Sequence, residues 1–169
     1  MSSAAPQPDS ATPLTALAVF DRCPPERLAA IEPSPEELEV ELGEAIVREG
    51  HLDHEWYVIL DGEASVSTAG HVLGVLGPGE HFGEIAILSR QPRRFTVRAL
   101  TPMRVLMLTE EAFLALLDDC APFGRTLLVR LTRRMSSLAE SESSLVPTQD
   151  AVTNDHLPGP HPSTATHLD

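Results

Sequence analysis

The feature that most constrains the fold of this chain is a row of short apolar segments between residues 37 and 108, separated by glycine-containing turns. Residues 38–42 alternate between apolar and acidic side chains, which is the period of a strand with one buried face. Residues 56–60 are continuously apolar, as in a buried strand, and Asp61 and Gly62 form a typical hairpin turn after it. This pattern predicts a β-sandwich or β-barrel.

The remaining strands are predicted from shorter apolar segments in the same region. They cover residues 46–48, 64–66, 72–76, 95–100 and 103–108. The last two of these segments flank Thr101 and Pro102, and we expect them to pair as a hairpin across those two residues.

Helices are predicted on both sides of the β region. Pro24, Pro25 and Glu26 are typical of a helix start, where proline is tolerated and an acidic side chain meets the positive end of the helix dipole. From Glu110 the apolar residues recur at helical spacing, and Pro122 begins a second such segment. The apolar positions of these two helices are Phe113, Leu114, Leu116, Leu117, Leu127, Leu128, Leu131, Met135 and Leu138.

The two ends of the chain differ in composition from its middle. Residues 1–13 are rich in Ser, Ala and Pro, and residues 141–169 in Ser, Pro, His, Thr and Asp, so both are predicted to be disordered tails. Residues 14–140 are long enough to form one domain with its own core. We expect no winged helix-turn-helix module in the stretch after residue 140, which disfavours a transcription factor.

Charge and cysteine content narrow the function classes. The formal net charge of −13 disfavours a nucleic-acid partner and an anionic membrane surface, because both require clustered basic residues. The N-terminal residues lack the basic and apolar regions of a signal peptide, and no apolar run approaches the roughly 20 residues of a membrane helix, so a cytoplasmic protein is predicted. Cys23 and Cys120 lie far apart without metal-binding spacing and are predicted to be reduced thiols.

The segment richest in chemistry is residues 82–99, which combines a glycine turn, a carboxylate, a short apolar helix and an arginine. An arginine binds a phosphate through two parallel hydrogen bonds, and backbone N–H groups at a helix start offer further donors to the same anion. A nearby carboxylate accepts a hydrogen bond from a sugar hydroxyl. The segment therefore predicts a site for a small anionic ligand that carries hydroxyl groups.

The spacing within this segment matches a known motif at Phe82-Gly83-Glu84, Ala86, Pro92-Arg93 and Thr96-Val97. With these residues the segment resembles the phosphate-binding cassette of cyclic nucleotide-binding domains, the family found in protein kinase A regulatory subunits, catabolite activator protein and cyclic-nucleotide-gated channels. The resemblance covers residues 14–140 and implies a mainly β fold with flanking α-helices, a jelly-roll β-barrel with an N-terminal helical segment and C-terminal lid helices. It implies a regulatory binding module and not an enzyme.

The resemblance also implies a role for individual residues. Arg93 is expected to bind the cyclic phosphate, and Glu84 to accept a hydrogen bond from the ribose 2′-hydroxyl. Gly83 would let the backbone approach the sugar, while Ile85 and Ala86 would contribute backbone N–H groups. The predicted ligand-binding set is Gly83, Glu84, Ile85, Ala86, Arg93, Arg94 and Thr96, with no metal.

Two residues depart from the family motif, in which small residues usually follow the phosphate-binding arginine. Members that prefer cGMP often carry threonine directly after that arginine. Arg94 stands there in this chain, which favours cAMP as the ligand and leaves cGMP as the alternative. Phe95 is predicted by strand alternation to point to the same side as Arg93. It either fills part of the pocket or lies in the core beneath the ligand.

The sequence therefore predicts a sensor that binds cAMP in preference to cGMP and signals by repositioning its C-terminal helix. Leu127, Leu128, Leu131 and Arg134 are the candidates for capping the base. The same helix offers a surface to a protein partner or to a second copy in a homodimer.

Two other functions are considered beside this one. The first is a degenerate fold of the same family that binds no nucleotide and acts as a protein-interaction scaffold, with Phe95 blocking the pocket. The second is a cupin-like metalloenzyme, suggested by His51, His54 and Glu55. It is disfavoured because the spacing of these residues differs from that of known zinc motifs.

Overall fold

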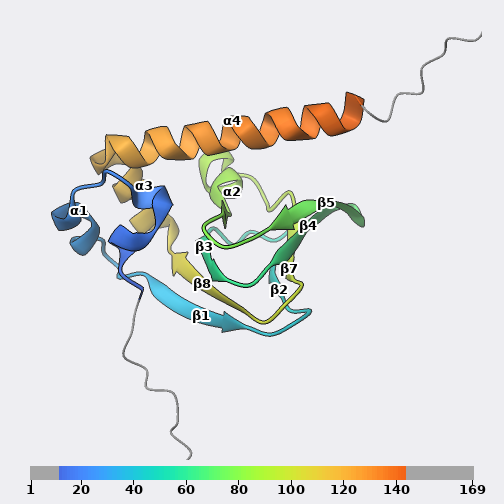
Figure 1. Ribbon diagram of the computed structural model, residues 1–169, viewed down its shortest axis with the longest axis horizontal. Coiled ribbons are helices and arrows are strands. Elements are labelled where there is room, and N and C mark those ends of the chain that lie inside the picture. Colours follow the sequence, from blue (N-terminus) through green and yellow to red (C-terminus); the bar gives the residue numbers. More distant parts are fainter. Residues whose placement is uncertain (1–11, 144–169) are drawn as a thin grey trace, which may run out of the picture.

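The computed structural model describes residues 12–143, and in it two four-stranded antiparallel sheets lie beneath a group of helices (Figure 1). Sheet A has the strand order β1-β8-β3-β6, and sheet B has the order β2-β7-β4-β5. The strand bounds are β1 Glu36–Val40, β2 Ala45–Val47, β3 Trp56–Asp61, β4 Ala64–Thr68, β5 His71–Leu76, β6 His81–Phe82, β7 Thr96–Ala99 and β8 Met103–Leu108. The predicted mainly β, jelly-roll class is confirmed, with two separate strand ladders in place of a closed barrel.

The helix bounds are η1 Leu14–Ala16, η2 Ala18–Phe20, α1 Pro25–Ala29, α2 Glu84–Ser89, α3 Glu110–Asp119 and α4 Ala121–Ser143. Helices α1, α3 and α4 form at the positions predicted from proline and from apolar spacing, beginning at Pro25, Glu110 and Ala121. The hydroxyl of Thr109 accepts a hydrogen bond from the backbone N–H of Ala112 at 3.3 Å and so caps α3. Helix α4 continues past the predicted domain end at residue 140, while residues 1–11 and 144–169 of the predicted tails lie outside the described residues.

Both predicted hairpins are wrong, because the strands on either side of each turn belong to different sheets. Asp61 and Gly62 carry the chain from β3 in sheet A to β4 in sheet B, and Thr101 and Pro102 carry it from β7 in sheet B to β8 in sheet A. These two corners pack against each other. Gly62 has a φ of 87°, and a Cβ atom there would lie 2.5 Å from the backbone carbonyl oxygen of Pro102, so glycine is required at this corner.

The tight hairpin of the structure lies elsewhere, between β4 and β5. Its turn residues, Ala69 and Gly70, have positive φ values of 47° and 80°, as type I′ turns require. The pairing of Thr68 with His71 closes this turn.

An aromatic cluster fastens the helices to sheet A. The ring of Trp56 on β3 lies 5.3 Å from that of Phe113 on α3 and 5.5 Å from that of Phe123 on α4, measured between ring centroids. Phe20 of η2 stacks on Phe123 at 5.7 Å. The first turns of α4 are therefore held by buried apolar contacts. A second core cluster lies within the sheets and includes Tyr57, Ile59, Val97 and Val105.

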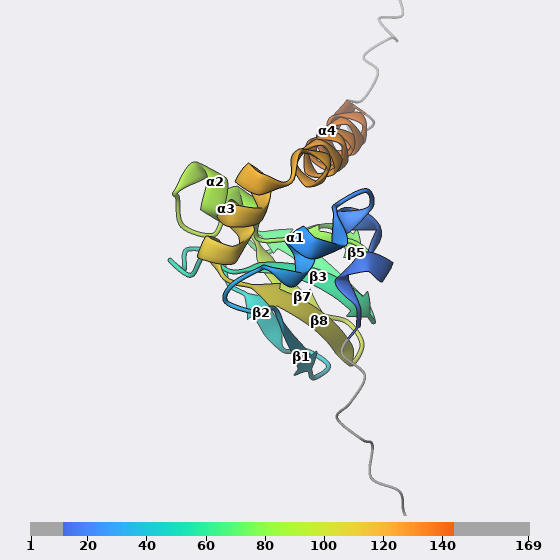
Figure 2. The same cartoon turned by 90° about the vertical axis from the view of Figure 1, so that its left-hand side faces the viewer.

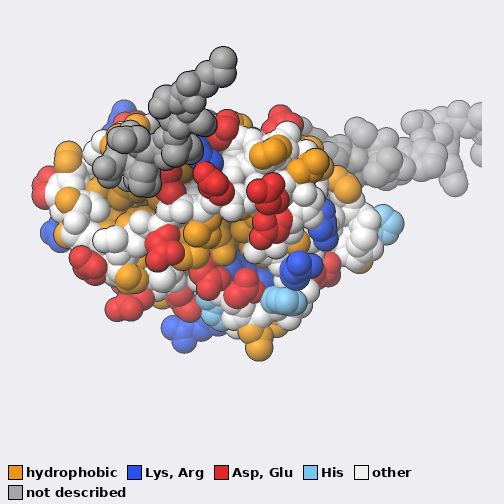
Figure 3. All heavy atoms as spheres, turned by 90° about the horizontal axis from the view of Figure 1, so that it is seen from below, with side chains coloured by type: hydrophobic (Ala, Val, Ile, Leu, Met, Phe, Trp, Pro, Cys, Tyr) orange, Lys and Arg blue, Asp and Glu red, His pale blue; other side chains and the backbone are white. Residues whose placement is uncertain are grey.

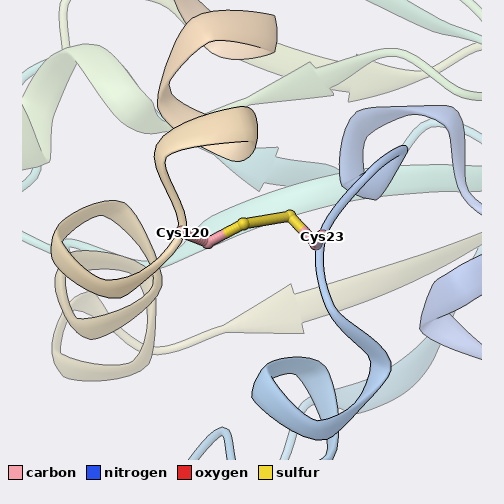
Figure 4. The surroundings of a disulfide bond; sticks show 2 residues. All are labelled: Cys23 and Cys120. Carbon is pink, nitrogen blue, oxygen red and sulfur yellow. A yellow bond between two sulfur atoms is a disulfide. The ribbon is translucent and has the colours of Figure 1, made fainter.

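A disulfide joins Cys23 to Cys120, which corrects the prediction of two reduced thiols (Figure 4). The two Cα atoms are 6.2 Å apart although 97 positions separate the residues in the chain. Cys120 lies between α3 and α4, and Cys23 lies between η2 and α1. The bond therefore ties the N-terminal helical segment to the junction of the two C-terminal helices.

The outer surface carries the acidic character of the chain. Acidic side chains are spread over the face shown in Figure 3, and β1 with the turn after it contributes the exposed residues Glu36, Glu39, Glu41 and Glu44. Figures 1 and 2 both place α4 along the upper edge of the molecule, above the sheets. Within residues 12–143, no helix combines the length and the apolarity that a membrane crossing requires.

The disulfide can be tested by thiol alkylation of the unfolded protein. We expect the chain to take up no alkylating reagent before reduction and two equivalents after it, because both cysteines are paired. Cys23→Ser should expose one reactive thiol and lower the free energy of unfolding by about 2–5 kcal/mol, since it opens a long covalent loop. Two reactive thiols in the unreduced wild type would contradict the assignment.

Candidate functional site

A cavity of about 320 Å³ lies between sheet B, residues 80–95 and α4. Its volume falls at the lower end of the range of ligand pockets, roughly 300–1,000 Å³. Sheet B contributes an apolar wall, whose residues are Val47, Val66, Leu73, Val75, Leu76 and Val97. Charged side chains come from the other two sides, namely Glu80, Glu84, Arg93, Arg94 and Arg134. The cavity thus has the mixed lining of a site for an amphipathic anion.

Gly83 allows the turn before α2 to lie in contact with Arg93. It precedes α2 with a φ of 105°, a conformation that side chains rarely adopt. A Cβ atom at this position would overlap the carbonyl oxygen of Glu55 and lie 3.0 Å from Nη1 of Arg93. We predict that Gly83 lets the backbone approach the ligand. In the structure the missing side chain also lets this segment pack against the start of β3.

Arg93 is buried, with 3% of its surface exposed, and its charge is compensated within the protein. Nη2 donates to the carbonyl oxygen of Glu55 at 2.8 Å and to Oε2 of Glu55 at 3.3 Å, and Nη1 donates to the carbonyl oxygen of Gly83 at 3.1 Å. Nε lies 3.5 Å from Oδ1 of Asp53, an ion pair in which neither atom makes a hydrogen bond. Sequence reasoning expected a ligand to be the partner and missed both acids.

The same acids act on Tyr57, whose ring stacks on Phe82 with centroids 5.1 Å apart. Burial and the negative charge of Glu55 raise the pKa of Tyr57 to about 12, against the opposing effect of Arg93. The phenol therefore stays protonated near neutral pH, and it can donate a hydrogen bond there.

Glu84 is buried, with 1% of its surface exposed, and each carboxylate oxygen has a partner. Nδ1 of His81 lies 3.2 Å from Oε2, and Nη1 of Arg134 donates to Oε1 at 3.3 Å. Burial alone would raise the pKa of Glu84. The hydrogen bond and charge of His81 and the charge of Arg134 outweigh burial, so the pKa lies below its ordinary value. Glu84 is thus a carboxylate at neutral pH.

Helix α4 is held over the cavity by two arginines. Nη2 of Arg134 donates to the carbonyl oxygen of His81 and lies 3.9 Å from Oε1 of Glu80. Nη1 of Arg130 donates to the carbonyl oxygen of Gly79 at 2.8 Å. Both contacts reach the turn and short strand before α2, so the position of α4 is linked to the cassette by polar contacts.

The candidates for capping the base separate into two groups. Leu131 and Arg134 line the cavity, together with Met135, which sequence reasoning did not propose for this role. Leu127 is instead buried in the core under the helices, and Leu128 is 63% exposed. The helical spacing of apolar residues did not distinguish these two groups, because the apolar face of α4 is wider than the part of it that lines the cavity.

The structure brings together most of the predicted ligand-binding residues. Gly83, Glu84, Ile85, Ala86, Arg93 and Arg94 all line the cavity. Thr96 is not among the lining residues, and its hydroxyl accepts a hydrogen bond from the backbone N–H of Glu49 at 3.1 Å. Phe95 is half-buried and forms part of the cavity wall, and the cavity exists beside it.

Two of the three residues considered for metal binding contact other side chains. Nδ1 of His54 lies 3.2 Å from Oε2 of Glu110, and Glu55 pairs with Arg93. In the described part of the chain, no three His, Cys, Asp or Glu side chains are grouped so that they could hold a metal ion.

Comparison of the sequence with known proteins gives a consistent result. A family model described as the cyclic nucleotide-binding domain matches residues 37–120. The chain is 34% identical over 112 residues to the cAMP-dependent protein kinase regulatory subunit of Mycosarcoma maydis. This match covers 61% of this chain and 21% of that protein. The corresponding subunit of Yarrowia lipolytica is 39% identical over 80 residues, 46% of this chain and 21% of that protein. The chain spans about a fifth of the length of these relatives.

Solved structures share the fold. The catabolite activator protein of Thermus thermophilus superposes with a TM-score of 0.62 and 26% identity, over 75% of this chain and 62% of that chain. A mutant of the cAMP-binding acyltransferase from Mycobacterium smegmatis gives a TM-score of 0.59 and 29% identity, over 69% and 38% of the two chains. A cAMP-bound protein described as PfPKA-R gives 0.65 at 24% identity, over 76% and 45%, and shows likeness of fold alone.

The low pKa of Glu84 predicts an acid-dependent contribution to stability. A depressed pKa stabilises the fold above the ordinary value of 4.5, and this contribution is lost as the pH falls through the lower value of the folded state. The difference in unfolding free energy between wild type and Glu84→Gln should therefore be largest near neutral pH and shrink below about pH 4.5. Urea unfolding across this range measures it, with Glu39→Gln on exposed β1 as the control. A difference that does not vary with pH would contradict the assignment.

Proposed function

We propose that this chain, which belongs to the cyclic nucleotide-binding domain family, is a regulatory sensor that binds cAMP in preference to cGMP and signals through the position of α4. The observation that carries the proposal is that Arg93 and Glu84, an anion-binding group and a hydroxyl acceptor, are both buried and line one cavity. A guanidinium donates to a phosphate and a carboxylate accepts from a hydroxyl, so the pair matches the two polar parts of a phosphorylated ribose.

Arg93 keeps donors for an incoming phosphate. A guanidinium has five N–H groups, and three hydrogen bonds of Arg93 go to Glu55 and Gly83, which leaves two. One of the remaining donors is Nε, a buried atom without a hydrogen-bond partner. An anion that accepted from it would supply the hydrogen bond that its ion pair with Asp53 does not make.

Glu84 couples the ligand to α4. In the structure Oε1 of Glu84 is held by Arg134 of α4, and the ribose hydroxyl of a bound nucleotide would use the same carboxylate. A ligand shifts the position of a helix only by interacting differently with its two states. Competition for Glu84 supplies such a difference, because it acts on the contact that holds α4 over the cavity.

The preference for cAMP rests on Arg94. This residue stands where family members that prefer cGMP often carry threonine, and its side chain is exposed at the cavity. The purine would lie against the apolar wall of sheet B.

One observation favours the alternative of a scaffold that binds no nucleotide. Asp53 and Glu55 already neutralise Arg93, so a cyclic phosphate would bring further negative charge into their neighbourhood. Phe95 also occupies part of the wall. Titration with cyclic nucleotides separates the two functions.

Calorimetric titration with cAMP and cGMP tests the proposal. We expect wild type to bind cAMP more tightly than cGMP, and Arg93→Ala to weaken cAMP roughly 100-fold, the usual effect of truncating one partner of a buried charged contact. Arg48→Ala, an exposed arginine, is the matched control and should bind as wild type does. Absence of binding by wild type would support the scaffold, and recovery of binding in Phe95→Ala would identify that ring as the cause.

A second titration tests the coupling to α4. Arg134→Ala should raise the affinity for cAMP about two- to fivefold, because it removes a partly exposed ion pair that competes for Glu84. Arg133→Ala on the exposed face of α4 should leave affinity unchanged. A loss of affinity in Arg134→Ala would mean that this arginine holds the ligand and does not compete with it.

A further inference from the structure

His81 is a fully buried polar residue that the proposed function does not yet use. It lies on β6, where it pairs with Val58 of β3. Its ring packs against Trp56 with centroids 5.5 Å apart. A polar ring is stable in such a place only when a partner satisfies it.

The partner is the carboxylate of Glu84. Nδ1 of His81 lies 3.2 Å from Oε2, while Nε2 is buried without a hydrogen-bond partner. Because Glu84 is ionised, the proton in this contact belongs to Nδ1, and the imidazole is the donor. The ring is thus oriented by packing, and its one hydrogen bond is directed at Glu84.

The two contacts of Glu84 differ in how firmly they are held. His81 belongs to a sheet and is fully buried, whereas the side chain of Arg134 is 30% exposed and lies on α4. Displacement of α4 would release Oε1, and the contact of Oε2 with His81 would stay. One oxygen of the carboxylate would then be free, at a defined position, to accept a hydrogen bond.

We propose that His81 is the positioning residue for Glu84, and that its Nδ1 donor makes the site select cyclic nucleotides that carry a free 2′-hydroxyl. The inference rests on the proposed function, since Glu84 must be the group that meets the ribose. Without the donor, a carboxylate this deeply buried rotates toward Arg134 or takes up a proton. In either state it no longer presents the same acceptor to the sugar.

Discrimination between two ligands tests the proposal. The probes are cAMP and 2′-deoxy-cAMP, which lacks the hydroxyl and keeps the cyclic phosphate and the base. We expect wild type to bind cAMP about tenfold or more tightly than the deoxy analogue, since a hydrogen bond to a charged group is involved. His81→Phe should lose most of this preference, mainly through weaker binding of cAMP.

A conservative variant separates positioning from packing. The amide nitrogen of Asn can replace the Nδ1 donor, so His81→Asn should retain more of the preference than His81→Phe or His81→Leu. Thermal unfolding confirms that each variant is folded. Equal weakening of both ligands in His81→Phe, with the preference intact, would overturn the proposal and leave His81 a packing residue.

A measurement without ligand tests the contact between His81 and Glu84 separately from nucleotide binding. In carboxyl NMR titrations the pKa of Glu84 should rise in His81→Phe relative to wild type and rise less in His81→Asn. If wild type bound neither nucleotide but the pKa rose in this way, the proposed function and the selectivity would fail while the positioning contact held. An unchanged pKa together with an unchanged preference would overturn the role of His81 alone.

Discussion

The compensation of the buried charge of Arg93 is the interaction around which the site is organised. A guanidinium with 3% exposure is costly to bury unless carboxylates and carbonyl oxygens surround it. Asp53 and Glu55 provide them from the loop just before β3, and Gly83 provides a third contact from the turn before α2. Arg93 therefore joins β3 to the cassette, and the absence of a side chain at Gly83 is what permits the approach.

The start and the middle of α4 are held by different kinds of interaction. Phe123, near its start, lies in the aromatic core, and the disulfide at Cys120 fastens the junction before it. Farther along, Arg130 and Arg134 make polar contacts with partly exposed side chains. Buried apolar contacts resist displacement more than polar contacts made by partly exposed side chains do. This asymmetry suits a helix that pivots at its start and releases along its length, as the proposed sensor requires.

Local patterns predicted the elements well and their pairing poorly. The apolar run before Asp61, the proline at α1 and the helical spacing after Glu110 all correspond to observed elements. The turn at Asp61 and Gly62 has the composition of a hairpin, yet it joins two sheets, because a turn sequence specifies backbone direction and not the strand that will lie alongside. The same limit applies to Cys23 and Cys120, whose separation in sequence concealed a distance of 6.2 Å between their Cα atoms.

Identity and spacing predicted that the cassette residues lie together, and six of the seven line one cavity. A short contiguous segment carries its own geometry, which is why Gly83, Glu84 and Arg93 could be placed near one another from the sequence, while their role in binding a ligand stays a prediction. Their partners could not be assigned in the same way. His81 lies three positions before Glu84, so its contact is local, but the family motif begins at Phe82 and gave no reason to single it out. Asp53, Glu55 and Arg134 reach the site from the loop before β3 and from a distant helix. The proximity of these three arises only when the sheets and α4 pack, because burial and charge compensation act through space and leave no local pattern in the chain.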